Sequence, residues 1–103
     1  MKIDNLFRDT APPLEGERFE TLLSHKGLLI ERIISSPRIA ATEYIQSQDE
    51  WVVLLQGEAT LDVAGEQIEL KAGDYVFLAA QTPHTVQKVS DGAVWLAVHL
   101  HHP

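Results

Sequence analysis

The chain has no cysteine among its 103 residues. This absence excludes disulfides, thiolate metal ligands and cysteine nucleophiles. Its apolar runs are only as long as a β-strand, so no segment is expected to cross a bilayer. The first five residues, Met1 to Asn5, also carry no apolar signal segment. We therefore expect a cytoplasmic protein with no membrane partner.

Positive charge is also scarce. Eight Lys and Arg residues stand against 15 Asp and Glu residues, which gives a formal net charge of −7. An acidic surface without a basic cluster repels phosphate backbones, so we expect no nucleic-acid partner. Anionic membrane surfaces are disfavoured for the same reason. The length suits one domain, and no internal repeat is visible.

Residues 1–27 are predicted to form an N-terminal arm followed by a short helix. The arm contains Pro12 and Pro13, which cannot continue a helix or a central strand. After it, Phe19, Leu22 and Leu23 are spaced as on one face of an amphipathic helix. A glycine at position 27 follows this segment, at a place where helices commonly end.

Residues 28–103 are predicted to form a β-barrel domain. Beyond position 27 the apolar residues alternate with a period of two, and Gly, Pro and Asp mark turns between the runs. Such a series favours an antiparallel sandwich or barrel, and a jelly roll would close the sheet around an interior. The predicted strands are 28–34, 38–46, 51–56, 59–63, 67–70, 75–79, 85–89 and 94–100.

Two spacings give the pattern its specificity. Glu50 is followed by six residues and then Gly57, and Gly73-Asp74 is followed after nine further residues by His84. This arrangement resembles the two motifs of the cupin family in register. The resemblance implies an all-β, single-domain cupin jelly-roll β-barrel that holds a small-molecule ligand.

The departures from the family motifs lie at the usual metal ligands. Tyr44 and Gln46 stand where the first motif has two histidines, whereas Glu50 and His84 are retained. The resemblance therefore implies a metal set of His84, Glu50 and Gln46, holding a divalent ion such as Zn, Fe, Mn or Ni. Carboxylate, imidazole and amide ligands are a weaker set than several imidazoles. Glu50 and Tyr44 are the candidate catalytic residues, because either could move a proton.

The strand period predicts that these side chains share one cavity. Residues 44 and 46 are two apart, so their side chains project to the same face of a strand. If that face is the interior, Gln46 meets Glu50 near one mouth of an otherwise apolar barrel. A Glu50 buried there without a cation should have a raised pKa, because desolvation disfavours its charged form.

Three functional interpretations follow. The first is a metal-dependent oxygenase or isomerase acting on a small molecule, and the second is a non-catalytic module that binds a small ligand. The third is a structural homodimer whose apolar strands, with Trp51 and Trp95, supply the interface; the family resemblance itself implies dimerisation. His99 and His101 are expected to be structural in all three.

Overall fold

The computed structural model describes residues 1–102, and its regular structure consists of nine β-strands. In chain order the strands are β1 (Glu17–His25), β2 (Leu28–Ser35), β3 (Glu43–Tyr44), β4 (Asp49–Gln56), β5 (Glu58–Val63), β6 (Glu66–Lys71), β7 (Tyr75–Leu78), β8 (His84–Val89) and β9 (Ala93–Leu100). The predicted all-β class is therefore correct. The second predicted strand, 38–46, shortens to the two residues of β3.

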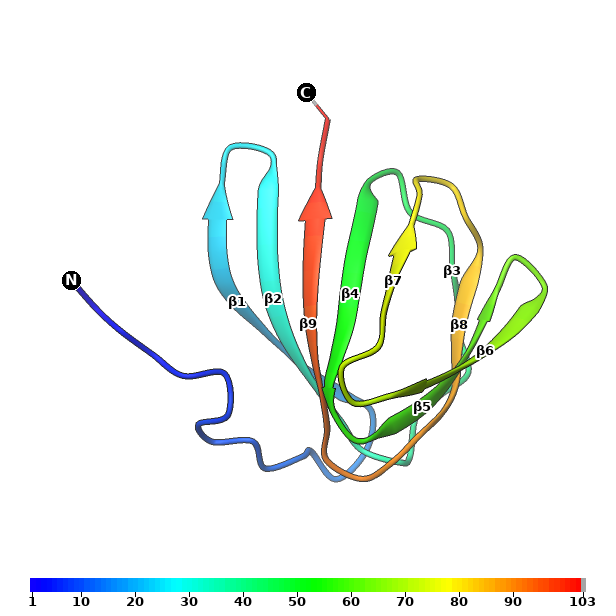
Figure 1. The fold of residues 1–103 in the computed structure, drawn as a ribbon, viewed down its shortest axis with the longest axis horizontal. Coiled ribbons are helices and arrows are strands. Elements are labelled where there is room, and N and C mark those ends of the chain that lie inside the picture. Colours follow the sequence, from blue (N-terminus) through cyan, green and yellow to red (C-terminus); the bar gives the residue numbers. More distant parts are fainter. Residues whose placement is uncertain (103) are drawn as a thin grey trace.

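The strands form two sheets that pack face to face. The larger sheet has the order β1-β2-β9-β4-β7, and the smaller has the order β3-β8-β5-β6. All neighbouring strands pair antiparallel. Figure 1 shows β1 and β2 on the side of the molecule farthest from β5 and β6.

The predicted N-terminal helix is wrong. Residues 17–25 form β1, which pairs along its length with β2, and the described residues contain no helix. The register shifts between Thr21 and Leu23, so a β-bulge interrupts the alternation there. Phe19, Leu22 and Leu23, whose spacing predicted one buried helical face, are all exposed in this strand. It follows that no helix in residues 1–102 could span a membrane.

The core lies between the sheets and is built by the strand alternation. Val52 and Leu54 of β4, Leu61 of β5 and Leu78 of β7 point inward and are almost fully buried. Trp95 of β9 joins them. At about 1.5–3 kcal/mol for each buried side chain of this size, the cluster is the main source of stability.

The β5–β6 connection is a tight turn. Val63 pairs with Glu66, so the loop has only two residues, Ala64 and Gly65. Both have positive φ, at 51° and 86°. A two-residue loop with two positive φ values matches the right-handed twist of a β-hairpin.

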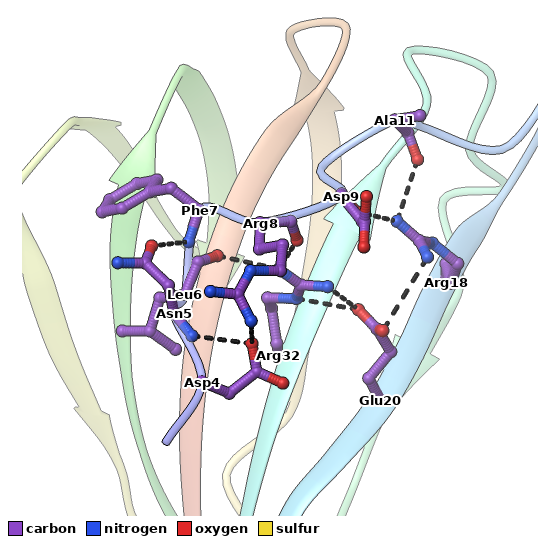
Figure 2. A network of polar contacts seen from close by, with 10 residues as sticks. All are labelled: Asp4, Asn5, Leu6, Phe7, Arg8, Asp9, Ala11, Arg18, Glu20 and Arg32. Atoms are coloured by element: carbon purple, nitrogen blue, oxygen red, sulfur yellow. Dashed lines mark hydrogen bonds and ion pairs between the residues drawn. The ribbon is translucent and has the colours of Figure 1, made fainter. Parts of the chain in front are cut away.

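The N-terminal arm crosses the outer face of the large sheet, where arginines hold it (Figure 2). Arg32 of β2 is 6% exposed, donates to the carbonyls of Leu6 and Arg8, and pairs with Glu20 of β1 at 2.6 Å. Arg18 donates to two further carbonyls of the arm. The arginine side chains on the outer face of β1 and β2 therefore hold the arm against the sheet.

Candidate functional site

A pocket of about 110 Å³ opens between the two sheets. Apolar side chains form most of its wall, and polar side chains gather on one side. The polar lining residues are Glu17, Glu31, Tyr44, Gln46, Glu50, His84 and His99, and the apolar ones include Phe19, Ile33, Val52, Leu61, Leu78, Val86 and Trp95. At ~30 Å³ per water molecule, the space would hold about four waters. It therefore suits a small ligand or one end of a larger one.

Glu50 lies at the centre of the polar side. Its strand, β4, is paired with β9 on one edge and β7 on the other, and Glu50 is opposite His99 and Leu78. The residue is only 7% exposed. An acid placed on an inward position of a central strand is withdrawn from bulk water, and a carboxyl there must find its partners inside the pocket.

Two imidazoles flank the Glu50 carboxyl. Oε1 of Glu50 lies 4.0 Å from Nε2 of His84 and 3.9 Å from Nδ1 of His99. His84 comes from β8 of the small sheet and His99 from β9 of the large sheet. The fold thus places imidazoles from two different sheets beside one carboxylate oxygen of Glu50. Both separations exceed hydrogen-bonding distance, which leaves room for a ligand atom or a water.

The remaining contacts of the two histidines fix their tautomers. Nδ1 of His84 lies 3.0 Å from the carbonyl oxygen of Thr82, which can only accept a hydrogen bond. Nε2 of His99 lies 2.9 Å from Oε1 of Glu31, so this nitrogen is the donor. The amide of Gln48 donates to the other His99 nitrogen at 3.3 Å. The nitrogen that each imidazole turns towards Glu50 is therefore unprotonated in the neutral form of the ring and carries an N–H in the charged form.

Burial raises the pKa of Glu50 above the ordinary value of 4.5. The charges of His99 and His84 and a hydrogen bond from Gln46 act in the opposite direction, but desolvation dominates. The expectation of a raised pKa therefore agrees with the structure. A carboxyl tuned in this direction is a better base at neutral pH than an exposed glutamate.

The other predicted site residues also line the pocket. Gln46 lies close enough to bond Glu50, and Tyr44 stacks on the His84 ring with centroids 5.9 Å apart. Tyr44 and His84 are direct neighbours across β3 and β8. The predicted residues Tyr44, Gln46, Glu50 and His84 thus meet in one cavity, although their chemical roles remain proposals.

Sequence reasoning missed three acid–base groups of the pocket. His99, which we expected to be structural, is 5% exposed and lies beside Glu50, and Glu31 holds it in place. Glu17, within the segment predicted to be helical, lines the pocket from β1. The available signal was the alternation itself: Glu31 occupies an inward position in β2, and His99 is the one polar residue of β9.

A buried hydrogen-bond chain orients Glu17. The indole Nε1 of Trp95 donates to Oγ of Ser35 at 3.1 Å, and Ser35 donates to Oε2 of Glu17 at 2.9 Å. Burial also raises the pKa of Glu17. Because Trp95 is 3% exposed and points inward, it cannot supply a dimer interface, and that part of the third interpretation is wrong. Dimerisation itself stays a prediction.

The spacing of the Glu50, His84 and His99 ligand atoms can be compared with the spacing that a bound metal ion requires. Ligand atoms bound to one ion at ~2.1 Å in tetrahedral geometry lie about 3.4 Å apart. The imidazole nitrogens are 3.9 and 4.0 Å from Glu50 Oε1. Across residues 1–102, no three His, Asp or Glu side chains are close enough together to hold an ion. The side chains as arranged therefore do not form a metal site.

Comparison with known proteins identifies the family. The family model described as a cupin domain matches residues 37–99, which is more than half of the chain. The chain therefore belongs to the cupin family. Searched against functionally curated proteins, the sequence finds no match.

Solved structures support the same assignment over the whole chain. A Ralstonia eutropha protein, provisionally named a mannose-6-phosphate isomerase, is 38% identical with a TM-score of 0.86, over 99% of this chain and 100% of that one. A Thermus thermophilus protein is 24% identical with a TM-score of 0.84, and both chains are covered completely. KdgF from Halomonas is 15% identical with a TM-score of 0.78, over 85% of this chain and 81% of its own. The last two show a shared fold alone.

Proposed function

We propose that this cupin binds a small polar molecule in the pocket and catalyses proton transfer on it, with Glu50 as the acid–base group. The observation that carries the proposal is the carboxyl of Glu50, buried between two imidazoles at 3.9 and 4.0 Å. Perturbed carboxyls in pockets are typical of acid–base sites. The reaction class agrees with the isomerase name given to the Ralstonia protein.

The proposed chemistry uses only groups that line the pocket. The carboxylate of Glu50 removes a proton from a carbon next to a carbonyl group and returns it to the same or the neighbouring carbon. Burial favours this step, because a carboxylate with a raised pKa holds the proton more firmly. His84 and His99 face the same oxygen and fix where the substrate can lie. Tyr44 borders the site and could bond the carbonyl oxygen.

The name of the Ralstonia protein does not carry its substrate to this chain. A phosphate ester is bound by cationic side chains or clustered backbone N–H groups. The pocket is lined by Glu17, Glu31 and Glu50 and by no Lys or Arg. Its volume of about 110 Å³ is also below the ~300 Å³ at which most ligand pockets begin. We therefore propose the reaction type without the phosphorylated substrate.

Hydrogen–deuterium exchange at carbon tests the proposed function without knowledge of the natural substrate. Hydroxyacetone, pyruvate and aminoacetone are incubated with the protein in D2O, and loss of C–H signals is followed by NMR. We expect exchange faster than in buffer for at least one compound, in proportion to protein concentration. Exchange equal to buffer for all three would contradict the proposal.

A divalent metal held by His84, Glu50 and Gln46 is the second candidate. The observation that favours it is that Nε2 of His84 lies 4.0 Å from Oε1 of Glu50, in a pocket that Gln46 also lines. Side-chain shifts of about half an ångström would bring these atoms to ligand distances. A bound ion would then act as a Lewis acid towards a substrate oxygen.

Metal content separates the two candidates. If the metal candidate holds, protein purified without chelator contains stoichiometric Zn, Fe, Mn or Ni, and His84→Ala loses the metal. The Gln46→His variant should bind the metal more tightly than wild type, because imidazole is a stronger ligand than an amide. Elemental analysis and metal titration measure all three. Wild-type protein that takes up none of these ions after soaking would eliminate the metal candidate.

A further inference from the structure

In β1 and β2, acidic and basic side chains point to opposite faces of the large sheet. In β1, Glu17 faces the pocket and its neighbour Arg18 faces the arm. In β2, Glu31 faces the pocket and its neighbour Arg32 faces the arm. The alternation of side chains along a strand thus turns the carboxylates inward and the guanidinium groups outward. The glutamates therefore line the pocket, whereas the arginines that follow them in sequence lie on the other side of the sheet.

Each pocket carboxyl has a hydroxyl or an imidazole nearby, but none of the three is paired with a Lys or Arg side chain. Ser35 bonds one oxygen of Glu17, and His99 bonds one oxygen of Glu31. Glu50 has a side chain only 9% exposed, and its Oε1 lies beyond hydrogen-bonding distance of both flanking imidazoles. The pKa of Glu17 is raised by burial and further by the charges of Glu31 and Glu50. These carboxyls therefore repel one another across a space that contains no Lys or Arg side chain.

The sheet that carries the three carboxyls also supplies aromatic surface to the pocket. Trp95 and Phe19 line the same cavity as the three carboxyls. An organic cation gains from the face of an aromatic ring as well as from a carboxylate. An anion would gain from neither and would be repelled by the carboxylates, with the imidazoles of His84 and His99 as the basic groups of the lining.

From these observations we infer that the pocket selects a small organic cation with N–H donors, an ammonium or guanidinium group, held by Glu17, Glu31 and Glu50 against Trp95. This inference rests on the proposed function, since it names the ligand class of the same site. The available volume, about 110 Å³, admits such a group and little more. Any remainder of the ligand would lie outside the mouth.

Titration with simple probes tests the ligand class apart from catalysis. Methylguanidinium and ethylammonium are compared with acetate, inorganic phosphate and glycerol by calorimetry and by the NMR signal of the Trp95 indole N–H. That group bonds Ser35, which bonds Glu17, so it reports on the pocket. The indole of Trp51, whose ring contacts Tyr75, serves as an internal control. We expect both cations to shift the Trp95 signal, and the other three probes to leave it unchanged.

Two further results belong to the expected outcome. Binding of a cation should release protons, because it lowers the raised pKa values of Glu17 and Glu50; the measured heat then depends on the ionisation enthalpy of the buffer. Glu17→Gln should weaken cation binding about tenfold, the value of one charge-assisted hydrogen bond. Glu66→Gln, at an exposed position in the β5–β6 hairpin, is the matched control and should leave it unchanged.

Acetate, phosphate or glycerol binding at Trp95 as tightly as the cations would overturn the inference. Cation binding that Glu17→Gln leaves intact would overturn it too. Neither result depends on proton transfer, so the proposed function could survive both. Conversely, cation binding without any carbon exchange would retain the ligand class and reject the catalytic role of Glu50.

Discussion

Glu50→Gln should abolish proton transfer while leaving the fold intact. We expect the rate of carbon-bound hydrogen exchange to fall at least ~100-fold, since a positioned general base contributes about 10²–10⁴-fold. The amide keeps the shape of the side chain in a position that is only 7% exposed. It cannot accept a proton from carbon. The exchange assay in D2O measures the effect, and Glu66→Gln is the control that should retain the wild-type rate.

The stability of the same variant separates loss of chemistry from loss of folding. Folding raises the pKa of Glu50 above 4.5, so the folded state binds more protons than the unfolded state. The stability that this residue contributes is therefore present below that value and is lost as pH rises through the raised pKa. Glu50→Gln removes this loss, and the variant should be at least as stable as wild type at pH 7. An inactive variant that is also largely unfolded would leave the catalytic assignment without support.

Gly57→Ala should cost considerably more stability than Gly73→Ala. Gly57 has φ of +96°, and a Cβ there would lie 2.6 Å from Oγ of Ser90 and 3.1 Å from Cα of Ala93. The Ser90 hydroxyl also accepts a hydrogen bond from the backbone N–H of Glu58, so it cannot move freely. Backbone strain of about 1–3 kcal/mol and crowding of a similar size should together remove about 2–5 kcal/mol.

Gly73→Ala is the matched control for this substitution. Gly73 has nearly the same φ, +94°, but a Cβ there would meet nothing within 4 Å. It should therefore show the backbone strain alone, about 1–3 kcal/mol. Chemical denaturation of both variants measures the two losses. Equal losses would mean that the close approach of Gly57 to Ser90 and Ala93 does not constrain the residue.

Local signals predicted the parts of the fold that depend on local chemistry. The period-two alternation and the turn residues beyond position 27 predicted a series of antiparallel strands, which the structure contains. The spacing from Glu50 to Gly57, together with His84, predicted the cupin fold that the family match shows. These features are set by short stretches of sequence.

The failures come from features that only the tertiary structure supplies. The β-bulge between Thr21 and Leu23 shifts the register of β1, and no residue type in the segment announces it. His99 becomes a neighbour of Glu50 through pairing of β4 with β9, two strands far apart in the chain. The alternation in β9 indicates that His99 points inward, but local sequence does not show that it lies beside Glu50. Long-range strand pairing therefore determined which acids and imidazoles share the pocket.

An NMR titration of the Glu50 side-chain carboxyl, with the rings of His84 and His99 followed in parallel, tests the central claim most directly. We expect the carboxyl to titrate above the ordinary 4.5, and each imidazole to sense that titration. In His99→Gln the carboxyl should titrate higher still, because a group that favours its charged form has been removed. A Glu50 carboxyl that titrates at or below 4.5 and leaves both rings undisturbed would contradict the buried acid–base cluster on which the proposed function depends.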